Sequence, residues 1–129
     1  MHMPNLKQIL ALDAASCALF CAAGVGAAAT VASLTGLPRE IVAGAGWICL
    51  PAAIFLAVAA LRPSRALVGA LAATNAGWVL ASLIVWVAHF SQLTPLGHAL
   101  VIAQAAAVEL FALLEWRGFK ALGGHAAPA

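Results

Sequence analysis

The chain has 129 residues and a formal net charge of +2, and 65% of its residues are hydrophobic while 8% are charged. A soluble domain carries about 25% charged residues, so this composition excludes an ordinary water-soluble protein. The small net charge and the lack of a basic run argue against a nucleic-acid partner, because clustered Lys and Arg are needed to hold a phosphate backbone. The lipid bilayer is the expected surrounding, and an integral membrane protein is the expected class.

Four apolar stretches follow one another along the chain, and each is long enough to cross a hydrocarbon core about 30 Å thick. They predict transmembrane helices over about 6–28, 40–61, 66–90 and 96–122. The connections are short, so neighbours in sequence are expected to lie antiparallel in space. The expected fold is therefore all-α: a single domain over 1–129 that forms a four-helix transmembrane bundle. We expect a short interfacial turn within 29–37 and a mobile tail over 123–129.

The first apolar stretch has an alternative interpretation as a cleaved signal peptide. Lys7 would be its charged start and Ile9–Cys21 its apolar middle, followed by small residues at a cleavage site. We expect a transmembrane helix instead, because the apolar run continues to full spanning length.

The basic residues predict the orientation in the membrane. With both termini in the cytoplasm, five of the six Lys and Arg residues lie inside: Lys7, Arg62, Arg65, Arg117 and Lys120. Only Arg39 then lies outside. Basic loops resist translocation, so this distribution favours a multi-pass protein with cytoplasmic termini.

Small residues recur at intervals of four on each predicted helix. They are Ala14, Ala18, Ala22 and Gly26; Ala45, Cys49, Ala53 and Ala57; Gly69, Ala73, Gly77 and Ala81; and Ala99, Ala103 and Ala107. Residues four apart share a helix face, and small side chains let membrane helices approach closely. We expect these stripes to form helix contacts, with one left over for a second copy of the chain. The alternative is chance, because the chain is rich in Ala.

Two segments carry a resemblance to a known group of proteins. NAGWVLASL at 75–83 and LTPLGHALVIAQAAAVELFALLEW at 93–116 resemble a family of small, functionally uncharacterised bacterial inner-membrane proteins with four helices, and GLPREIVAGAG at 36–46 also fits. The matching positions are Asn75, Trp78, Thr94, Pro95, Gly97, Gln104 and Trp116. The resemblance implies a location in the bacterial inner (plasma) membrane and no established activity. The family often has Asn where this chain has Asp13, which argues against an essential charge there.

Polar side chains within the predicted helices are the candidate functional residues. They are Asp13, Asn75, Gln104 and Glu109. An ionisable group in a bilayer costs roughly 2.5–3.5 kcal/mol on insertion scales, so such groups normally face the bundle interior or water. If Asp13 and Glu109 flank one cavity with Asn75 between them, they form the minimum needed for a proton-coupled carrier or a cation path. The alternative is that a protonated Glu109 bonds Asn75 and only joins two helices.

Two further residues have structural interpretations. Glu115 is expected near the inner membrane surface, where it pairs with Lys7 or Arg65. Pro51 removes a backbone hydrogen bond and is expected to kink the second membrane helix near the midplane. The freed carbonyl of Trp47 would face a cation beside a cavity, as in broken transporter helices, or the kink would serve packing alone.

No catalytic residue, cofactor or metal site is expected from the remaining residues. Three Cys without a C-x-x-C motif argue against disulfides and a redox enzyme. His89 and His98 are too few ligands for a metal site. The chain has no nucleophile–base pair, phosphate-binding glycine loop or dinucleotide fingerprint, so we expect that it is not an enzyme.

Two functions remain as expectations. The first is an oligomeric transporter or channel-like protein for protons or a small polar or cationic solute. Four helices enclose little volume, so such a pathway needs at least a dimer, and a homo-oligomer is expected. The second is a non-catalytic accessory or assembly subunit of a larger membrane complex, in which the polar groups only fix helix pairing.

Overall fold

The structure is a computed structural model that describes the backbone of residues 5–125 and the side chains of residues 5–123. Over this range it contains five helices: α1 (Leu6–Gly26), α2 (Ala28–Thr35), α3 (Arg39–Leu61), α4 (Arg65–Ala88) and α5 (Pro95–His125). The predicted all-α class is confirmed. The helices α1, α3, α4 and α5 are each long and apolar enough to cross a membrane, which suggests a multi-pass membrane protein.

The segment between the first two long helices differs from the prediction. Residues expected to form an interfacial turn instead form α2, an eight-residue helix that follows a break in the backbone at Ala27. Gly36 ends α2 in the left-handed region, with φ of 81°, where a side chain would be strained. At the other end of the chain, α5 runs past its predicted end at 122 and continues to His125. The rest of the predicted mobile tail, 126–129, lies outside the described residues.

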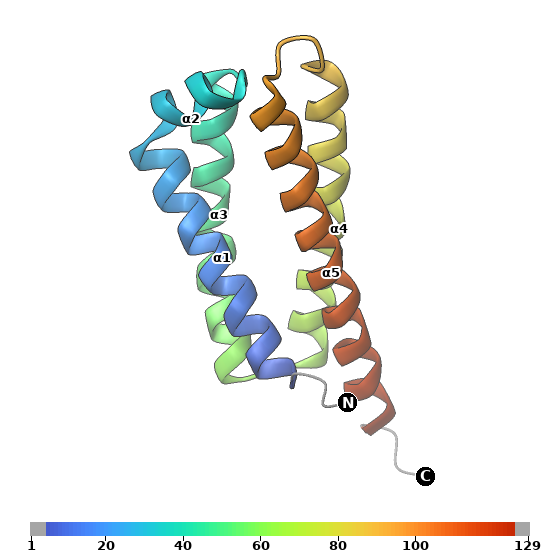
Figure 1. Cartoon of the computed structure of the whole chain (residues 1–129). Coiled ribbons are helices and arrows are strands. Elements are labelled where there is room, and N and C mark those ends of the chain that lie inside the picture. Colours follow the sequence, from blue (N-terminus) through green and yellow to red (C-terminus); the bar gives the residue numbers. More distant parts are fainter. Residues whose placement is uncertain (1–4, 126–129) are drawn as a thin grey trace.

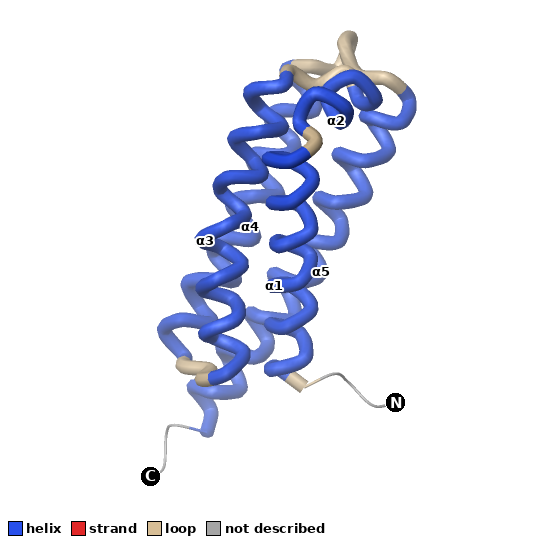
Figure 2. Tube along the Cα trace, turned by 90° about the vertical axis from the view of Figure 1, so that its left-hand side faces the viewer, coloured by secondary structure: helices blue, strands red, loops and turns tan. Residues whose placement is uncertain are grey.

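The four long helices are arranged as two pairs (Figure 1). Along most of their length α1 packs against α3, and α4 packs against α5, whereas contact between the pairs is sparse. We call the end where α1 begins and α5 ends the terminal end, and the opposite end, which carries α2 and the loop between α4 and α5, the loop end. The view turned by 90° shows the same arrangement, with α2 at the loop end (Figure 2).

The tightest approach within the α1–α3 pair occurs at two glycines. A Cβ atom built on Gly24 would lie 2.8 Å from the Cα atom of Gly46, and one built on Gly46 would lie 2.9 Å from the Cα atom of Gly24. The two backbones are therefore in direct contact, and neither position has room for a side chain. This contact lets dispersion hold the pair together in lipid, where no hydrophobic force acts between helices.

The prediction that the small-residue stripes form the helix contacts is wrong for most of them. The following members are exposed: Ala18, Ala22 and Gly26 on α1; Ala73, Gly77 and Ala81 on α4; and Ala99, Ala103 and Ala107 on α5. A Cβ atom on Gly77 would meet nothing within 4 Å. The spacing of four places these residues on one face, but it does not say that this face is the packed one.

The two helix pairs meet at the terminal end through an apolar cluster. Leu10 of α1, Leu56 and Ala59 of α3, and Val68 and Leu71 of α4 are buried together there. Phe119 and Leu122 of α5 pack against the same cluster. All four long helices therefore contribute to the core at this end.

At the loop end, Thr94 ties the α4–α5 loop to the end of α2. Its backbone N–H donates to the carbonyl oxygen of Thr35 at 2.9 Å, and its hydroxyl donates to the carbonyl oxygen of Leu34 at 2.6 Å. The same hydroxyl oxygen accepts a hydrogen bond from the backbone N–H of Gly97 at 3.0 Å, which caps the start of α5. The helix pairs are thus joined at both ends of the molecule.

Candidate functional site

Two carboxyl groups are buried together in the terminal half of the structure. Asp13 of α1 is 1% exposed and Glu115 of α5 is fully buried. The side chain of Asn75, on α4, joins them. Its Nδ2 atom donates to Oδ2 of Asp13 at 2.7 Å and to Oε1 of Glu115 at 2.8 Å. An amide nitrogen has two hydrogens, so both donors of Asn75 are used by the carboxyl groups.

The orientation of the Asn75 amide bears on whether this site suits protons or metal cations. Reversing the amide would place its oxygen against two carboxyl oxygens, so the nitrogen must be the atom between them. Hard metal cations are held by oxygen ligands, whereas here N–H groups point at the carboxyl oxygens. Within the described residues, no group of three or more His, Cys, Asp or Glu side chains is placed to hold a metal ion. The arrangement suits protons better than metal cations.

One oxygen of the site lacks a hydrogen-bond donor. Oε2 of Glu115 is buried and has no partner among the described residues. The carboxyl groups of Asp13 and Glu115 accept from the same Nδ2 atom of Asn75, so they are close neighbours. If both were ionised they would repel each other, whereas a proton on Oε2 of Glu115 would remove the charge of that group.

A small cavity adjoins Asp13 and Asn75. Its volume is about 50 Å³, and its polar lining comes from Asp13, Ser16, Thr74, Asn75 and the indole of Trp78, with the thiols of Cys17 and Cys49 beside them. A buried water needs at least about 10–15 Å³ and two to four polar partners, so the cavity has room and partners for water. Thr74 is also exposed, so the cavity lies close to the surface of the bundle. Water in it would be a route by which a proton reaches Asp13.

The structure changes which glutamate belongs to the site. Glu109, which the sequence placed beside Asp13 and Asn75, lies on the exposed side of α5 and does not join them. Glu115 takes that place. The predicted ion pair of Glu115 with Lys7 or Arg65 is wrong, because its carboxyl group is fully buried while both basic residues are exposed. Arg65 instead lies over the ring of Phe119, with its guanidinium carbon 4.1 Å from the ring centre.

Glu115 is the main residue that the sequence analysis misassigned, although a signal was present. It lies within the predicted span of 96–122, where a carboxyl group facing lipid is costly. Glu115 lies close to the end of the predicted span, which favours an ion pair at the membrane surface. In the structure, however, Glu115 lies on the face of α5 that is turned toward Asn75, and this position brings the two side chains together.

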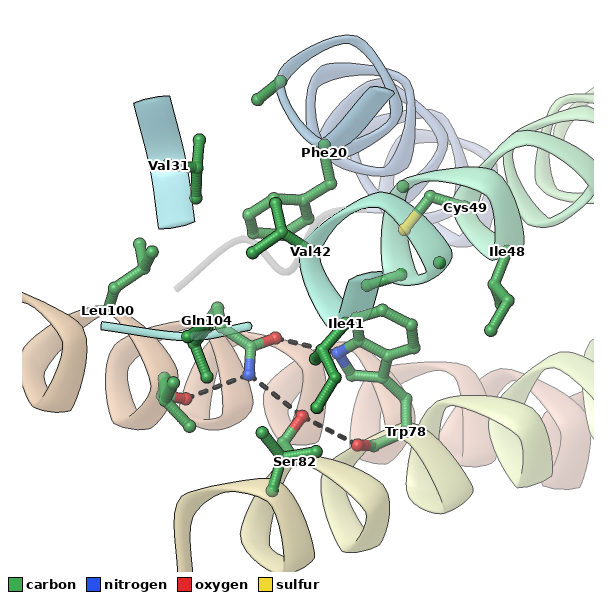
Figure 3. Close-up of a pocket in the computed structure, with 18 of the residues that line it drawn as sticks. Phe20, Val31, Ile41, Val42, Ile48, Cys49, Trp78, Ser82, Leu100 and Gln104 are labelled. Carbon is green, nitrogen blue, oxygen red and sulfur yellow. Dashed lines mark hydrogen bonds between the residues drawn. The ribbon is translucent and has the colours of Figure 1, made fainter. Parts of the chain in front are cut away.

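Gln104 belongs to a separate polar cluster toward the loop end (Figure 3). Its Oε1 atom accepts a hydrogen bond from Nε1 of Trp78 at 2.8 Å. Its Nε2 atom donates to Oγ of Ser82 and to the carbonyl oxygen of Val101, each at 2.9 Å. Gln104 precedes Glu115 by eleven residues on α5, or about 16 Å at 1.5 Å per residue, so it is not part of the carboxyl site.

The remaining candidates also lie apart from the carboxyl groups. Nδ1 of His98 accepts from Nε1 of Trp86 at 3.0 Å, while Nδ1 of His89 lies 3.0 Å from Oε1 of Gln92. The two histidines therefore have different partners. All three cysteines are free. Pro51 lies within α3, on its exposed side together with Trp47, so a carbonyl freed there does not line either cavity; the kink itself stays a prediction.

Comparison with known proteins found no related protein. No protein-family model matches the chain, and no curated protein or solved structure matches it. The resemblance to a bacterial inner-membrane family therefore stays a prediction, and the function has to be argued from the site.

Proposed function

We propose that the chain is a small integral membrane protein of the transporter or channel-like class, in which Asp13, Asn75 and Glu115 form a proton-exchange site. One observation carries this proposal: two buried carboxyl groups share one amide, and one of their oxygens has no hydrogen-bond donor among the described residues. The small cavity beside Asp13 supports it, because a group that exchanges protons needs contact with water.

Electrostatics explains how this site would work. It is costly to ionise two neighbouring carboxyl groups together in a medium of low dielectric constant, because like charges repel strongly there. The pair therefore favours the state in which it holds one proton, and Asn75 donates to both groups in either state. Loss of this proton leaves one more negative charge inside the bundle. Such a charge is expensive in a membrane, so the entry of a proton or a positively charged solute is favoured.

The proposed membrane arrangement follows from the charge distribution of the chain. We take the four long helices to cross the membrane in alternating directions, with both termini in the cytoplasm of a bacterial cell, because this puts five of six basic residues inside. The carboxyl site then lies in the cytoplasmic half of the membrane.

The exposed Glu109 supports an assembly of more than one chain. Glu109 lies near the middle of the span Pro95–Gly123, and its side chain is on the outer side of α5. A carboxyl group that faces lipid costs roughly 2.5–3.5 kcal/mol on insertion scales, so a neighbouring protein that covers it removes this cost. A second copy of the chain is the neighbour that we propose.

The same residue favours the second candidate function, an accessory or assembly subunit of a larger complex. In that case a different protein covers Glu109, and the carboxyl pair only joins helices. The mass of the intact protein, purified in a mild detergent, separates the two functions: multiples of one chain support the transporter class, whereas stoichiometric foreign subunits support the accessory role.

The proton-exchange site is tested by following its carboxyl groups directly. Infrared difference spectra of the purified protein report the C=O band of a protonated carboxyl group, here between about pH 5 and pH 9, the range around neutral in which a useful site must titrate. We expect one band to lose intensity with rising pH in the parent and to vanish in Glu115→Gln. Glu109→Gln is the matched control, because it makes the same change on the exposed side of the same helix.

The control variant separates the buried pair from the exposed glutamate. In Glu109→Gln the band should lose intensity over the same pH range as in the parent, because the bonds of Asn75 to the buried carboxyl groups are unchanged. A parent band that keeps constant intensity over the whole range would show that the pair does not exchange protons, and would leave only a structural role.

A further inference from the structure

A second cavity, much larger than the first, lies between the two helix pairs in the loop-end half of the molecule (Figure 3). Its volume is about 740 Å³. All five helices line it, and Val31 is the contribution of α2. This volume lies within the range of about 300–1,000 Å³ that is typical of sites for small molecules.

The side chains that line this cavity leave no polar donor that a ligand would have to satisfy. Apart from Trp78, Ser82 and Gln104, its lining side chains are apolar residues, glycines or a cysteine. Those three polar groups bond one another: Trp78 donates to Gln104, and Gln104 donates to Ser82. The hydroxyl of Ser82 donates in turn to the carbonyl oxygen of Trp78 at 2.8 Å. Every side-chain N–H and O–H donor of this cluster is therefore used within the cluster or by the backbone.

Hydrocarbon is the material that such a space accepts in a bilayer. A buried water needs two to four polar partners, which these walls do not offer. An empty space of this size would forfeit dispersion contacts along its whole lining. Ile48 of α3 and Ala81 of α4 line the cavity and are also exposed, so it opens to the surface of the bundle. Both lie within membrane-spanning segments, where the surrounding medium is lipid chains.

We propose that this cavity binds an acyl chain of a membrane phospholipid, which enters sideways between α3 and α4. These two helices contact each other sparsely, although a short turn joins them at the terminal end. Ile41 and Gly44 on α3 face the cavity from one side and Val85 on α4 from the other. The head group stays at the loop-end surface of the membrane. This inference stands on the cavity alone and does not depend on proton exchange at the carboxyl site.

Two glycines provide a matched pair of substitutions for the test. Gly44 lines the cavity, and a Cβ atom on it would meet nothing within 4 Å, so a larger side chain can grow into the space. Gly77 has equally open surroundings but lies on the exposed side of α4 and lines neither cavity. Gly44→Phe should therefore occupy part of the cavity, whereas Gly77→Phe adds the same ring outside it.

The readout is the fluorescence of Trp78, which lines the cavity. The other three tryptophans (Trp47, Trp86 and Trp116) are replaced with Phe, and the protein is placed in bilayers of a phospholipid that carries bromine on its acyl chains, which quenches indole fluorescence on contact. We expect strong quenching in this background. We expect quenching to fall about twofold or more with Gly44→Phe, because the aromatic ring takes space that the lipid chain occupied, and to stay unchanged with Gly77→Phe.

A second variant and a direct measurement of bound lipid test the same proposal independently. If Gly44→Phe does not fold, as judged by its circular dichroism, Ala81→Phe blocks the cavity from the opposite wall and should give the same loss. Mass spectrometry of the intact parent protein should show a bound phospholipid, and Gly44→Phe should lose it. Equal quenching in all variants would mean that lipid only touches the outer surface, and would overturn the proposal, as would a bound free fatty acid in place of the phospholipid.

Discussion

Replacing Asn75 with Ala tests whether the carboxyl site holds the helices together. The substitution removes the amide whose Nδ2 atom donates to Asp13 at 2.7 Å and to Glu115 at 2.8 Å. Glu115 is affected most, since its other oxygen already lacks a partner among the described residues. A fully buried carboxyl group would then have no hydrogen-bond partner among the described residues.

The expected magnitude follows from the number of bonds lost. A side-chain hydrogen bond between membrane helices contributes about 0.6 kcal/mol on average and about 1.7 kcal/mol at most, because the unfolded chain in the membrane also finds partners. Two such bonds disappear in Asn75→Ala, and no group replaces the donors. We therefore expect the free energy of unfolding to fall by about 1–3 kcal/mol. At about 1.4 kcal/mol per factor of ten, this lowers the folding equilibrium constant by roughly five- to 150-fold.

Reversible unfolding in mixed micelles, followed by circular dichroism as the share of denaturing detergent rises, measures this difference. Thr74→Ala is the matched control: it changes the neighbouring residue, which is exposed and whose hydroxyl donates only to the carbonyl oxygen of Ala70 in its own helix. The control should change the free energy of unfolding by less than about 0.5 kcal/mol, as is usual for exposed positions. If Asn75→Ala and Thr74→Ala unfold at the same detergent ratio, the bonds of Asn75 do not stabilise the fold and the reasoning fails.

Two further predictions concern packing and orientation. Gly24→Leu should destabilise the protein by at least about 1–3 kcal/mol, because it forces a side chain against the backbone of Gly46, whereas Gly77→Leu should leave the unfolding curve unchanged; a larger effect at Gly77 would mean that the exposed side of α4 is a contact surface. A reporter inserted at Ser64 should be active only in the cytoplasm and one at Gln92 only outside, since the basic residues favour cytoplasmic termini. The reverse pattern of activity would place the carboxyl site in the outer half of the membrane.

The sequence was sufficient to predict the long helices, because apolar length alone specifies them. Each of the four predicted spans overlaps a helix that is long and apolar enough to cross a membrane, although the ends differ by a few residues. The short helix α2 was missed, since its eight residues are apolar but too few to count as a span. Gly36 ends this helix in the left-handed region, within the residues 29–37 that were predicted to form a turn.

The rotation of each helix about its axis was not predictable in the same way. In α5 the two glutamates are six residues apart, which places them about 240° apart around the helix at 3.6 residues per turn. Only one of them can face the interior. Because the helix is apolar on all sides, no polar stripe indicates which face points inward; depth in the membrane and small neighbours on the same face both favour Glu109. Asp13 and Asn75 were expected to share a cavity, and the structure places them in contact.

The hydrogen bond between Trp78 and Gln104 could not be predicted, because the sequence does not give the relative height of the two helices. A buried indole N–H usually finds an acceptor, and Gln104 was one of the few side chains able to provide it. The pairing requires the relative height of α4 and α5, which the connecting loop determines. Thr94 ties that loop to the end of α2, and no pattern in the sequence predicts those contacts.

The two attachments between the helix pairs limit how the molecule can move. Near the terminal end Asn75 of α4 holds Asp13 of α1, and at the loop end Thr94 holds Leu34 and Thr35, while the large apolar cavity lies between these points. If the two helix pairs separated at one end, the hydrogen bonds at that end would break. With both attachments intact, the cavity can widen only if the helices bend outward between them. Bending is easiest where a backbone hydrogen bond is missing, which in α3 is at Pro51. We therefore expect α3 to bend more readily than the other long helices when the cavity widens with both attachments intact.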